Sequence, residues 1–318
     1  MEYVISLAMF AAVYIIVVTG YGLSAGLGKQ FLISQAAMWG VGAYVYGILS
    51  LETDWPTAVC ALLGVAGGVV ASAVIALTAL RVSGIYLAIV SFAFQIVFVT
   101  VLQNLEITGG QSGLAGIRGM SSIGPLTETE SALLVAVAAC AVVVLAYRVL
   151  HGSAFGLTVR ALGEDPQVLE GLGVRPAVLK IKIICLSGGT AALGGVLYAQ
   201  YLSYIDANAF SIHVSITLLS MLIVGGSRAV LGPAVGALFY QLIPQLLQYL
   251  EIQAAEAADL LQILFGLLLL LFLLFRPEGI VAPPAPALRA ARTSRPPPSP
   301  PPGPGVDRDR VAAAEGRS

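Results

Sequence analysis

Residues 151–182 read HGSAFGLTVRALGEDPQVLEGLGVRPAVLKIK and form a hydrophilic stretch between two strongly apolar parts of the chain. The stretch is too long for a tight turn between two membrane spans. Pro166 is suited to a first helical turn, and Gly171 and Gly173 are suited to the end of a helix. We therefore predict a short helix over residues 165–172, outside the membrane. The charged residues of the stretch are Arg160, Glu164, Asp165, Glu170, Arg175, Lys180 and Lys182.

The apolar residues of this stretch bear on the role of the predicted helix. Leu162, Val168, Leu169 and Leu172 are expected to form a narrow apolar stripe. Two interpretations are open at this point: a solvated connector between two membrane halves, or a docking element that presents a face to another protein.

Composition places the rest of the chain in a membrane. Of the 318 residues, 58% are hydrophobic and 10% are charged, and the mean hydropathy is +0.91. A soluble globular domain carries about 25% charged residues. We expect an all-α, polytopic transmembrane bundle of about 8–10 spans, since each span needs roughly 20 apolar residues. The net charge of −1 gives no reason to expect a nucleic-acid partner.

The apolar segments give nine candidate spans, and two of them are unusual. The segment 212–227 is short, and the segment 26–50 is rich in Gly and carries Lys29, Gln30 and Gln35. Short or Gly-interrupted segments are typical of discontinuous helices beside a transport pathway, although plain helix packing also explains them. The nine candidates are 3–25, 30–50, 57–80, 84–104, 131–150, 182–202, 212–227, 230–250 and 258–275.

The distribution of Lys and Arg predicts the orientation, because short cytoplasmic loops are enriched in both residues. If residues 151–182 are cytoplasmic, only Arg118 among the cations up to Arg276 falls outside. The N-terminus is then outside and the C-terminus is cytoplasmic. The cytoplasmic cations are Lys29, Arg81, Arg148, Arg160, Arg175, Lys180, Lys182, Arg228 and Arg276, and the outer acids are Glu52, Asp54, Glu106, Glu128, Glu130, Asp206, Glu251, Glu256 and Asp259.

Two further segments differ from the transmembrane domain, which is predicted over residues 1–276. The outer loop 105–130 is rich in Gly and Ser, and it is either a flexible connection or a shaped docking surface. Residues 277–318 contain 11 of the 17 prolines of the chain. This composition predicts a disordered cytoplasmic tail.

The sequence lacks the motifs of an enzyme or a metal site. No HExxH or CxxC pattern occurs, and the three cysteines match no metal or redox spacing. The nearest string to a nucleotide-binding loop, LSAGLGKQ at 23–30, has Leu23 and Gln30 where that motif requires Gly and Ser or Thr. We therefore expect no cofactor, no metal and no catalytic residue, and no nucleotide hydrolysis by this chain.

Polar residues inside the predicted spans are few. Gln95, Gln200 and Gln241 are the main ones, and interhelical hydrogen bonding explains them. The spans carry no central ionisable residue, which argues against a carboxylate-dependent antiporter. The small-residue pairs Gly22/Gly26, Gly64/Gly68 and Gly232/Gly236 are explained by close helix packing. The chain has a conduit and a docking element but no energy source, so energy is expected from a partner through residues 151–182.

Several blocks of the sequence resemble the permease subunits of ABC importers for branched-chain amino acids, the LivM type within the LivH/LivM family. They cover residues 20 to 280, nearly the whole chain except its tail. The blocks are GYGLSAGLGKQFLISQAAMWGVGAYVYGILS (20–50), LRVSGIYLAIVSFAFQIVFVTVLQNLEITGGQSGLAGI (80–117), RALGEDPQVLEGLG (160–173), LSGGTAALGGVLYAQY (186–201), VGGSRAVLGPAVGALFYQLIPQLL (224–247) and FRPEGI (275–280).

The resemblance implies a multi-pass protein of the bacterial plasma (inner) membrane that acts with partners. A second permease subunit, identical or homologous, completes the path through the lipid. Two ATP-binding subunits dock on the cytoplasmic loops, and a periplasmic or extracellular binding protein delivers the substrate. The candidate residues for coupling to the ATPases are Arg160, Glu164, Asp165, Glu170 and Gly173. No substrate-binding residue is assigned.

The sequence departs from the family pattern at several of these positions. Gly163 stands where Arg is common, and Val168 and Leu169 stand where Ala is common. Lys29 and Gln35 stand where Gly and His are common. The family also moves urea, short amides and aromatic acids, so the substrate stays open. Two other functions are also open: a secondary transporter that needs no ATPase, and a non-transporting membrane scaffold.

Overall fold

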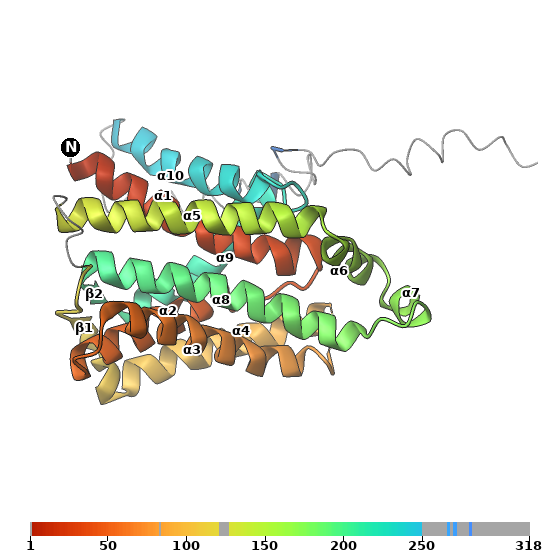
Figure 1. Ribbon diagram of the computed structural model, residues 1–318, viewed down its shortest axis with the longest axis horizontal. Coiled ribbons are helices and arrows are strands. Elements are labelled where there is room, and N and C mark those ends of the chain that lie inside the picture. The colour runs from red at the N-terminus through yellow and green to blue at the C-terminus, as the bar shows by residue number, and fades with distance from the viewer. Residues whose placement is uncertain are drawn as a thin grey trace, which may run out of the picture. The chain divides into compact units, whose positions relative to one another are not determined.

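The computed structural model describes residues 2–82, 84–120 and 127–249, together with 266–267, 270–271 and 280–281. Within these ranges the chain is a helical bundle with one two-stranded ribbon (Figure 1). The last candidate span, 258–275, and the predicted tail, 277–318, lie almost entirely outside the described residues. The elements are α1 (Glu2–Tyr21), η1 (Gly22–Leu27), α2 (Gln35–Glu52), α3 (Thr57–Thr78), α4 (Ile85–Asn104), η2 (Glu106–Thr108), η3 (Gly110–Ser112), β1 (Leu114–Ala115), α5 (Glu128–Gly152), α6 (Ala154–Glu164), α7 (Pro166–Gly171), α8 (Pro176–Leu202), β2 (Tyr204–Ile205), η4 (Ala207–Phe210), α9 (Ile212–Gly225) and α10 (Gly232–Tyr249).

Each of the eight candidate spans up to residue 250 coincides with a helix, so the chain is an all-α polytopic membrane protein. Five described segments are long and apolar enough to cross a membrane unaided: α1 with η1, α3, α4, α5 and α8. Helix α9 is apolar but has only 14 residues, and α2 and α10 have 18 residues each. These shorter helices include both segments whose sequences are unusual.

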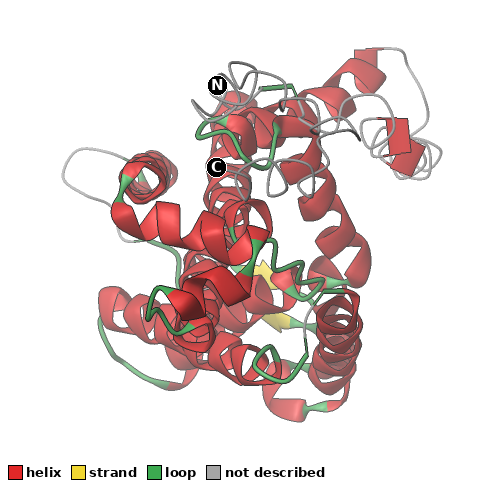
Figure 2. Ribbon diagram, turned by 90° about the vertical axis from the view of Figure 1, so that its right-hand side faces the viewer, coloured by secondary structure: helices red, strands yellow, loops and turns green. Residues whose placement is uncertain are grey.

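The charged residues separate to the two ends of the bundle. At one end β1 pairs with β2, and the Arg118 guanidinium contacts the Asp54 carboxylate at 2.6 Å. At the other end lie α6, α7 and the ion pairs of Glu164 with Lys29 and Arg228. Figure 2 views the chain from this second end, with the strands on the far side. Lys29 and Arg228 therefore lie at the same end as residues 151–182, and Arg118 lies at the other end, as the sequence predicted.

Helix α8 packs against α1, α2 and α3, and small residues allow the close approach. A side chain at Gly195 of α8 would overlap the Trp39 carbonyl of α2, and a side chain at Gly68 of α3 would overlap Ala192 of α8. The Gly64/Gly68 and Gly232/Gly236 pairs both lie at such contacts, which confirms the packing interpretation. Neighbouring helices therefore touch backbone to backbone along α8.

Candidate functional site

The hydrophilic stretch folds as two helices, α6 and α7, that project from one end of the bundle (Figure 1). The predicted short helix over 165–172 is confirmed as α7, which has Pro166 in its first turn. Asp165 caps it, because its carboxylate accepts a 2.9 Å hydrogen bond from the Gln167 amide. The chain leaves α7 through Gly173, whose φ of 76° is a left-handed conformation that glycine adopts readily.

The preceding helix α6 was not predicted as a separate element, and its presence changes the expected apolar stripe. Leu162 on α6 and Leu169 on α7 are each only 2% exposed, whereas Val168 is 56% and Leu172 is 73% exposed. The prediction of one stripe was wrong, because the break at Asp165 separates the four residues onto two helices. The two buried leucines hold the loop on the bundle, and the two exposed residues form an apolar pair on α7.

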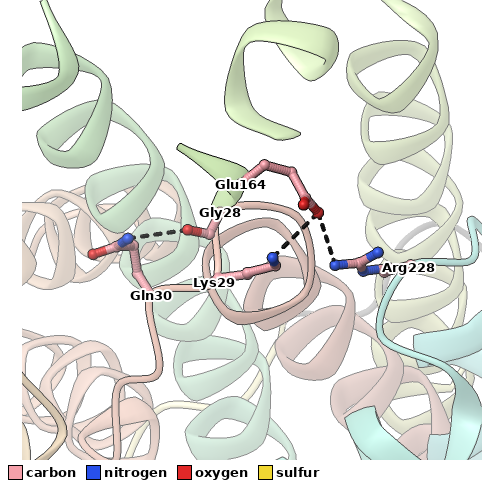
Figure 3. A network of polar contacts seen from close by, with 5 residues as sticks. All are labelled: Gly28, Lys29, Gln30, Glu164 and Arg228. Atoms are coloured by element: carbon pink, nitrogen blue, oxygen red, sulfur yellow. Dashed lines mark hydrogen bonds and ion pairs between the residues drawn. The ribbon is translucent and has the colours of Figure 1, made fainter. Parts of the chain in front are cut away.

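Glu164, the last residue of α6, joins three segments that are far apart in the sequence (Figure 3). Its Oε1 atom lies 3.2 Å from Lys29 Nζ and 3.1 Å from Arg228 Nη2. Hydrogen bonding and charge from Lys29, with a further contribution from Arg228, lower the pKa of the Glu164 carboxyl below its ordinary value. Glu164 is therefore ionised at neutral pH and is shared between two cations. We call Glu164, Lys29 and Arg228 the Glu164 cluster.

The backbone at Gly163 explains how α6 comes so close to the segment after η1. A side chain at Gly163 would lie 2.7 Å from the Leu27 carbonyl oxygen and 3.1 Å from Lys29 Cγ. Only a residue without Cβ fits there without movement of the backbone. Lys29 itself has a φ of 51°, a left-handed conformation that a non-glycine residue adopts at a cost of about 1–2 kcal/mol. Two departures from the family pattern thus meet at one contact.

Arg160 turns toward the bundle. Its Nη2 atom lies 2.7 Å from His151 Nδ1 and donates a 2.8 Å hydrogen bond to the His151 carbonyl. His151 Nε2 lies 3.0 Å from the Arg228 carbonyl oxygen. A neutral imidazole protonated on Nε2 satisfies both ring contacts. Arg160 therefore joins α6 to the end of α5, and His151 joins the end of α5 to the turn before α10.

The five candidate coupling residues thus divide into two groups. Arg160 and Glu164 form the intramolecular contacts of α6: Arg160 contacts His151, and Glu164 contacts Lys29 and Arg228. Asp165, Glu170 and Gly173 cap, flank or end α7 and stay exposed. Sequence reasoning did not include Lys29, Arg228 or His151 among the site residues. The available signal was the position of both cations on the cytoplasmic side of the charge distribution.

Inside the bundle, α2 begins beside the middle of α4, at the depth of the membrane. Gln95 of α4 is fully buried, and its Oε1 accepts a 2.8 Å hydrogen bond from the Ala37 amide. Its Nε2 donates a 2.6 Å hydrogen bond to the Phe210 carbonyl, just before α9. Ser215 of α9 bonds both Gln95 Oε1 and the Ala36 amide. The predicted interhelical role of Gln95 is confirmed. Water is absent at this depth, so side chains of α4 and α9 bind the first amides of α2 in its place.

A second polar group ties the same region to α8. Ser187 of α8 donates a 3.3 Å hydrogen bond to Gln35 Oε1 and accepts one of 3.0 Å from Ser24 of η1. The segment between η1 and α2 is therefore held at membrane depth by side chains of α4, α8 and α9. Among the residues that the structure describes, no group of three or more His, Cys, Asp or Glu side chains is placed to hold a metal ion.

Comparisons with known proteins agree with this architecture. The chain is 23% identical over 312 residues to the high-affinity branched-chain amino acid transport system permease protein LivM of Escherichia coli K12, a match that covers 90% of this chain and 71% of the relative. The LivM protein of Salmonella typhimurium is 25% identical over 70% of this chain and 58% of its own length. A probable LivM protein of Methanocaldococcus jannaschii is 28% identical over 67% of this chain and 65% of its own length.

The family model described as the branched-chain amino acid transport system permease component matches residues 3–273, which is most of the chain. No solved structure matches the chain. The chain belongs to the family of branched-chain amino acid transport system permease components.

Proposed function

We propose that this chain is a membrane-spanning subunit of an ATP-binding-cassette importer for branched-chain amino acids or a related small polar solute. Family membership over residues 3–273 supports the transport role. The relatives are themselves permease proteins of branched-chain amino acid transport systems. In this proposal the chain hydrolyses no ATP, and partner subunits supply the energy.

The observation that carries the proposal is the apolar pair on α7. Leu172 directly follows α7, and its amide bonds the Val168 carbonyl at 3.2 Å, so the two residues are one helical turn apart and lie on the same face. Both are largely exposed, whereas Leu169 beside them is buried against the bundle. An exposed i, i+4 apolar pair on a projecting helix suits insertion into a groove of another protein. We assign this face to an ATP-binding subunit, with Glu170 and Gly173 beside the contact.

The remaining assignments follow from that contact. The end with α6 and α7 is cytoplasmic in this proposal, which puts the N-terminus outside and the Pro-rich residues 277–318 inside the cell. The opposite end, with β1, β2 and the loop 105–130, receives a periplasmic or extracellular binding protein. A second permease subunit, identical or homologous, completes the path in the bacterial inner membrane. The positive charge at the α6–α7 end supports this orientation.

The test is co-purification of the chain, in detergent, with the ATP-binding subunits encoded beside it. Val168→Asp combined with Leu172→Asp is expected to release those subunits, because two charges would be buried in an apolar groove. Leu157→Asp is the matched control: Leu157 is 62% exposed, similar to the other two, but lies on α6. Retention of the ATPases by the double variant would refute α7 docking. A wild-type chain that moves solute in liposomes without ATP would refute the ABC assignment.

A further inference from the structure

The Glu164 cluster lies between the coupling loop and two segments that lead into the bundle. Lys29 lies in the segment 28–34 that enters α2, and Arg228 lies in the turn 226–231 between α9 and α10 (Figure 3). We infer that Glu164 is a positioning residue that transmits displacement of α7 to the starts of α2 and α9. This inference rests on the proposed function and adds the route by which the coupling loop acts.

The first step of the route runs from α7 to the end of α6. Asp165 is the only residue between the two helices, so α7 has little freedom to move without Glu164. The end of α6 is held by the ion pairs of Glu164, by the close approach of Gly163 to the Leu27 carbonyl, and by Arg160 through His151. A displacement of α7 therefore pulls or pushes on these contacts at the end of α6.

The second step runs from the Glu164 cluster to the middle of the membrane along two branches. From Lys29, six residues lead to Gln35 and the amides of Ala36 and Ala37, which are bound by Ser215 and Gln95. From Arg228, the chain leads back into α9, which carries Ser215. Both branches end at the Gln95 side chain, so a shift of the loop reaches one point through two segments.

The contacts of Glu164 distinguish it from a docking residue. Its carboxylate already pairs with two cations of its own chain, and an ATPase would have to displace one of them. Glu170, on α7, is exposed and forms no ion pair within the described part of the chain. Glu170 is therefore the matched control: the same side chain, in the same loop, without the contacts of the cluster.

The experiment compares Glu164→Gln and Glu170→Gln in the purified importer with its ATPases, reconstituted in liposomes. Glu164→Gln is expected to keep the ATPase subunits bound and the hydrolysis rate within about twofold. The number of solute molecules moved per ATP is expected to fall about fivefold, since residues between coupled sites change coupling by roughly 0.5–2 kcal/mol. Glu170→Gln is expected to leave that ratio unchanged.

A charge-reversal series separates electrostatic positioning from a structural defect. Glu164→Lys alone is expected to lose coupling, because it faces Lys29 and Arg228. Combining it with Lys29→Glu and Arg228→Glu recreates two opposite-charge pairs and is expected to restore the ratio. The contact of His151 Nε2 with Arg228 uses the Arg228 backbone carbonyl, so none of these substitutions removes either partner atom. Failure of the triple variant to regain coupling, while it folds and binds ATPase, would refute the positioning role.

The outcomes also separate this inference from the proposed function. If Glu164→Gln releases the ATPase subunits, Glu164 is a docking residue, and the inference fails while the importer assignment stands. If the ratio stays at the wild-type value, the cluster carries no coupling and the inference fails. If the wild-type chain binds no ATPase at all, the proposed function itself is wrong, whatever the variants do.

Discussion

Replacing Gln95 by leucine tests the claim that α2 begins at membrane depth with its first amides bound by side chains of other helices. The substitution keeps a similar volume but removes the acceptor of the Ala37 amide and the donor to the Phe210 carbonyl. Gln95 is fully buried, so water does not replace either partner. Each orphaned backbone group costs about 1–3 kcal/mol. Leucine recovers about 1–2 kcal/mol because no amide has to be buried. The two orphaned groups together cost about 2–6 kcal/mol, so the expected net loss is about 2–3 kcal/mol of unfolding free energy, within a range of about 0–5 kcal/mol.

Equilibrium unfolding of the purified protein by sodium dodecyl sulfate in mixed micelles measures this loss. The buried Trp39 is a suitable fluorescent reporter, because its ring lies 5.5 Å from the ring of Phe210, whose carbonyl Gln95 binds. Gln103→Leu is the control on the same helix: its amide contacts only Asn208, at 3.4 Å and exposed to solvent. A Gln95→Leu protein that differs from the Gln103→Leu protein by less than about 0.5 kcal/mol would refute the capping role.

Two further predictions concern packing and ionisation. Gly195→Ala is expected to lower the thermal stability and yield of the protein, since its Cβ would overlap the Trp39 carbonyl, whereas Gly152→Ala meets open space and is expected to be neutral; both are measured by thermal unfolding in detergent. Glu164 has a folded-state pKa below its ordinary 4.5, so its stabilisation is complete well above pH 4.5 and is lost as the pH falls through the folded-state value. The unfolding free energy of wild type is therefore expected to exceed that of Glu164→Gln by about 0.5–1 kcal/mol at pH 7 and to match it near pH 3, and an undiminished difference near pH 3 would contradict the ion-pair account.

The helices of the bundle were predictable because each membrane span requires a long run of apolar residues. The start of α2 was not, because the side chains that bind its first amides come from elsewhere in the fold. The amide of Ala37 is bound by Gln95, 58 residues away, and that of Ala36 by Ser215, 179 residues away. No local pattern at residue 35 reports such partners. The Gly-rich composition of 26–50 did indicate an irregular segment, and the short apolar segment 212–227 is the regular helix α9.

Residues 151–182 also contain features that were predictable from neighbouring residues and features that depend on distant ones. Its helix α7 was predicted from Pro166 and Gly173, which act within a few residues of themselves. The helix α6 was not predicted as a separate element, because Gly163 near its end reads as a helix breaker. The reason for this glycine is visible only in the structure, where the Leu27 carbonyl leaves no room for a Cβ. An arginine in a hydrophilic stretch is expected to face solvent. The guanidinium of Arg160 instead contacts His151 of the same chain.

The side chains that bind the amides at the start of α2 impose an order on the biogenesis of the protein. A chain is made from its N-terminus, so the first residues of α2 leave the ribosome before Ser91 and Gln95, and long before Ser215, have been synthesised. Until those side chains arrive, the amides of Ile33, Ala36 and Ala37 have no protein partner in the lipid. The N-terminal part of α2 must therefore wait beside water, at the membrane surface or inside the insertion machinery. By contrast, α9 enters a membrane in which Gln95 is already present, and its Ser215 supplies the last partner of the α2 amides.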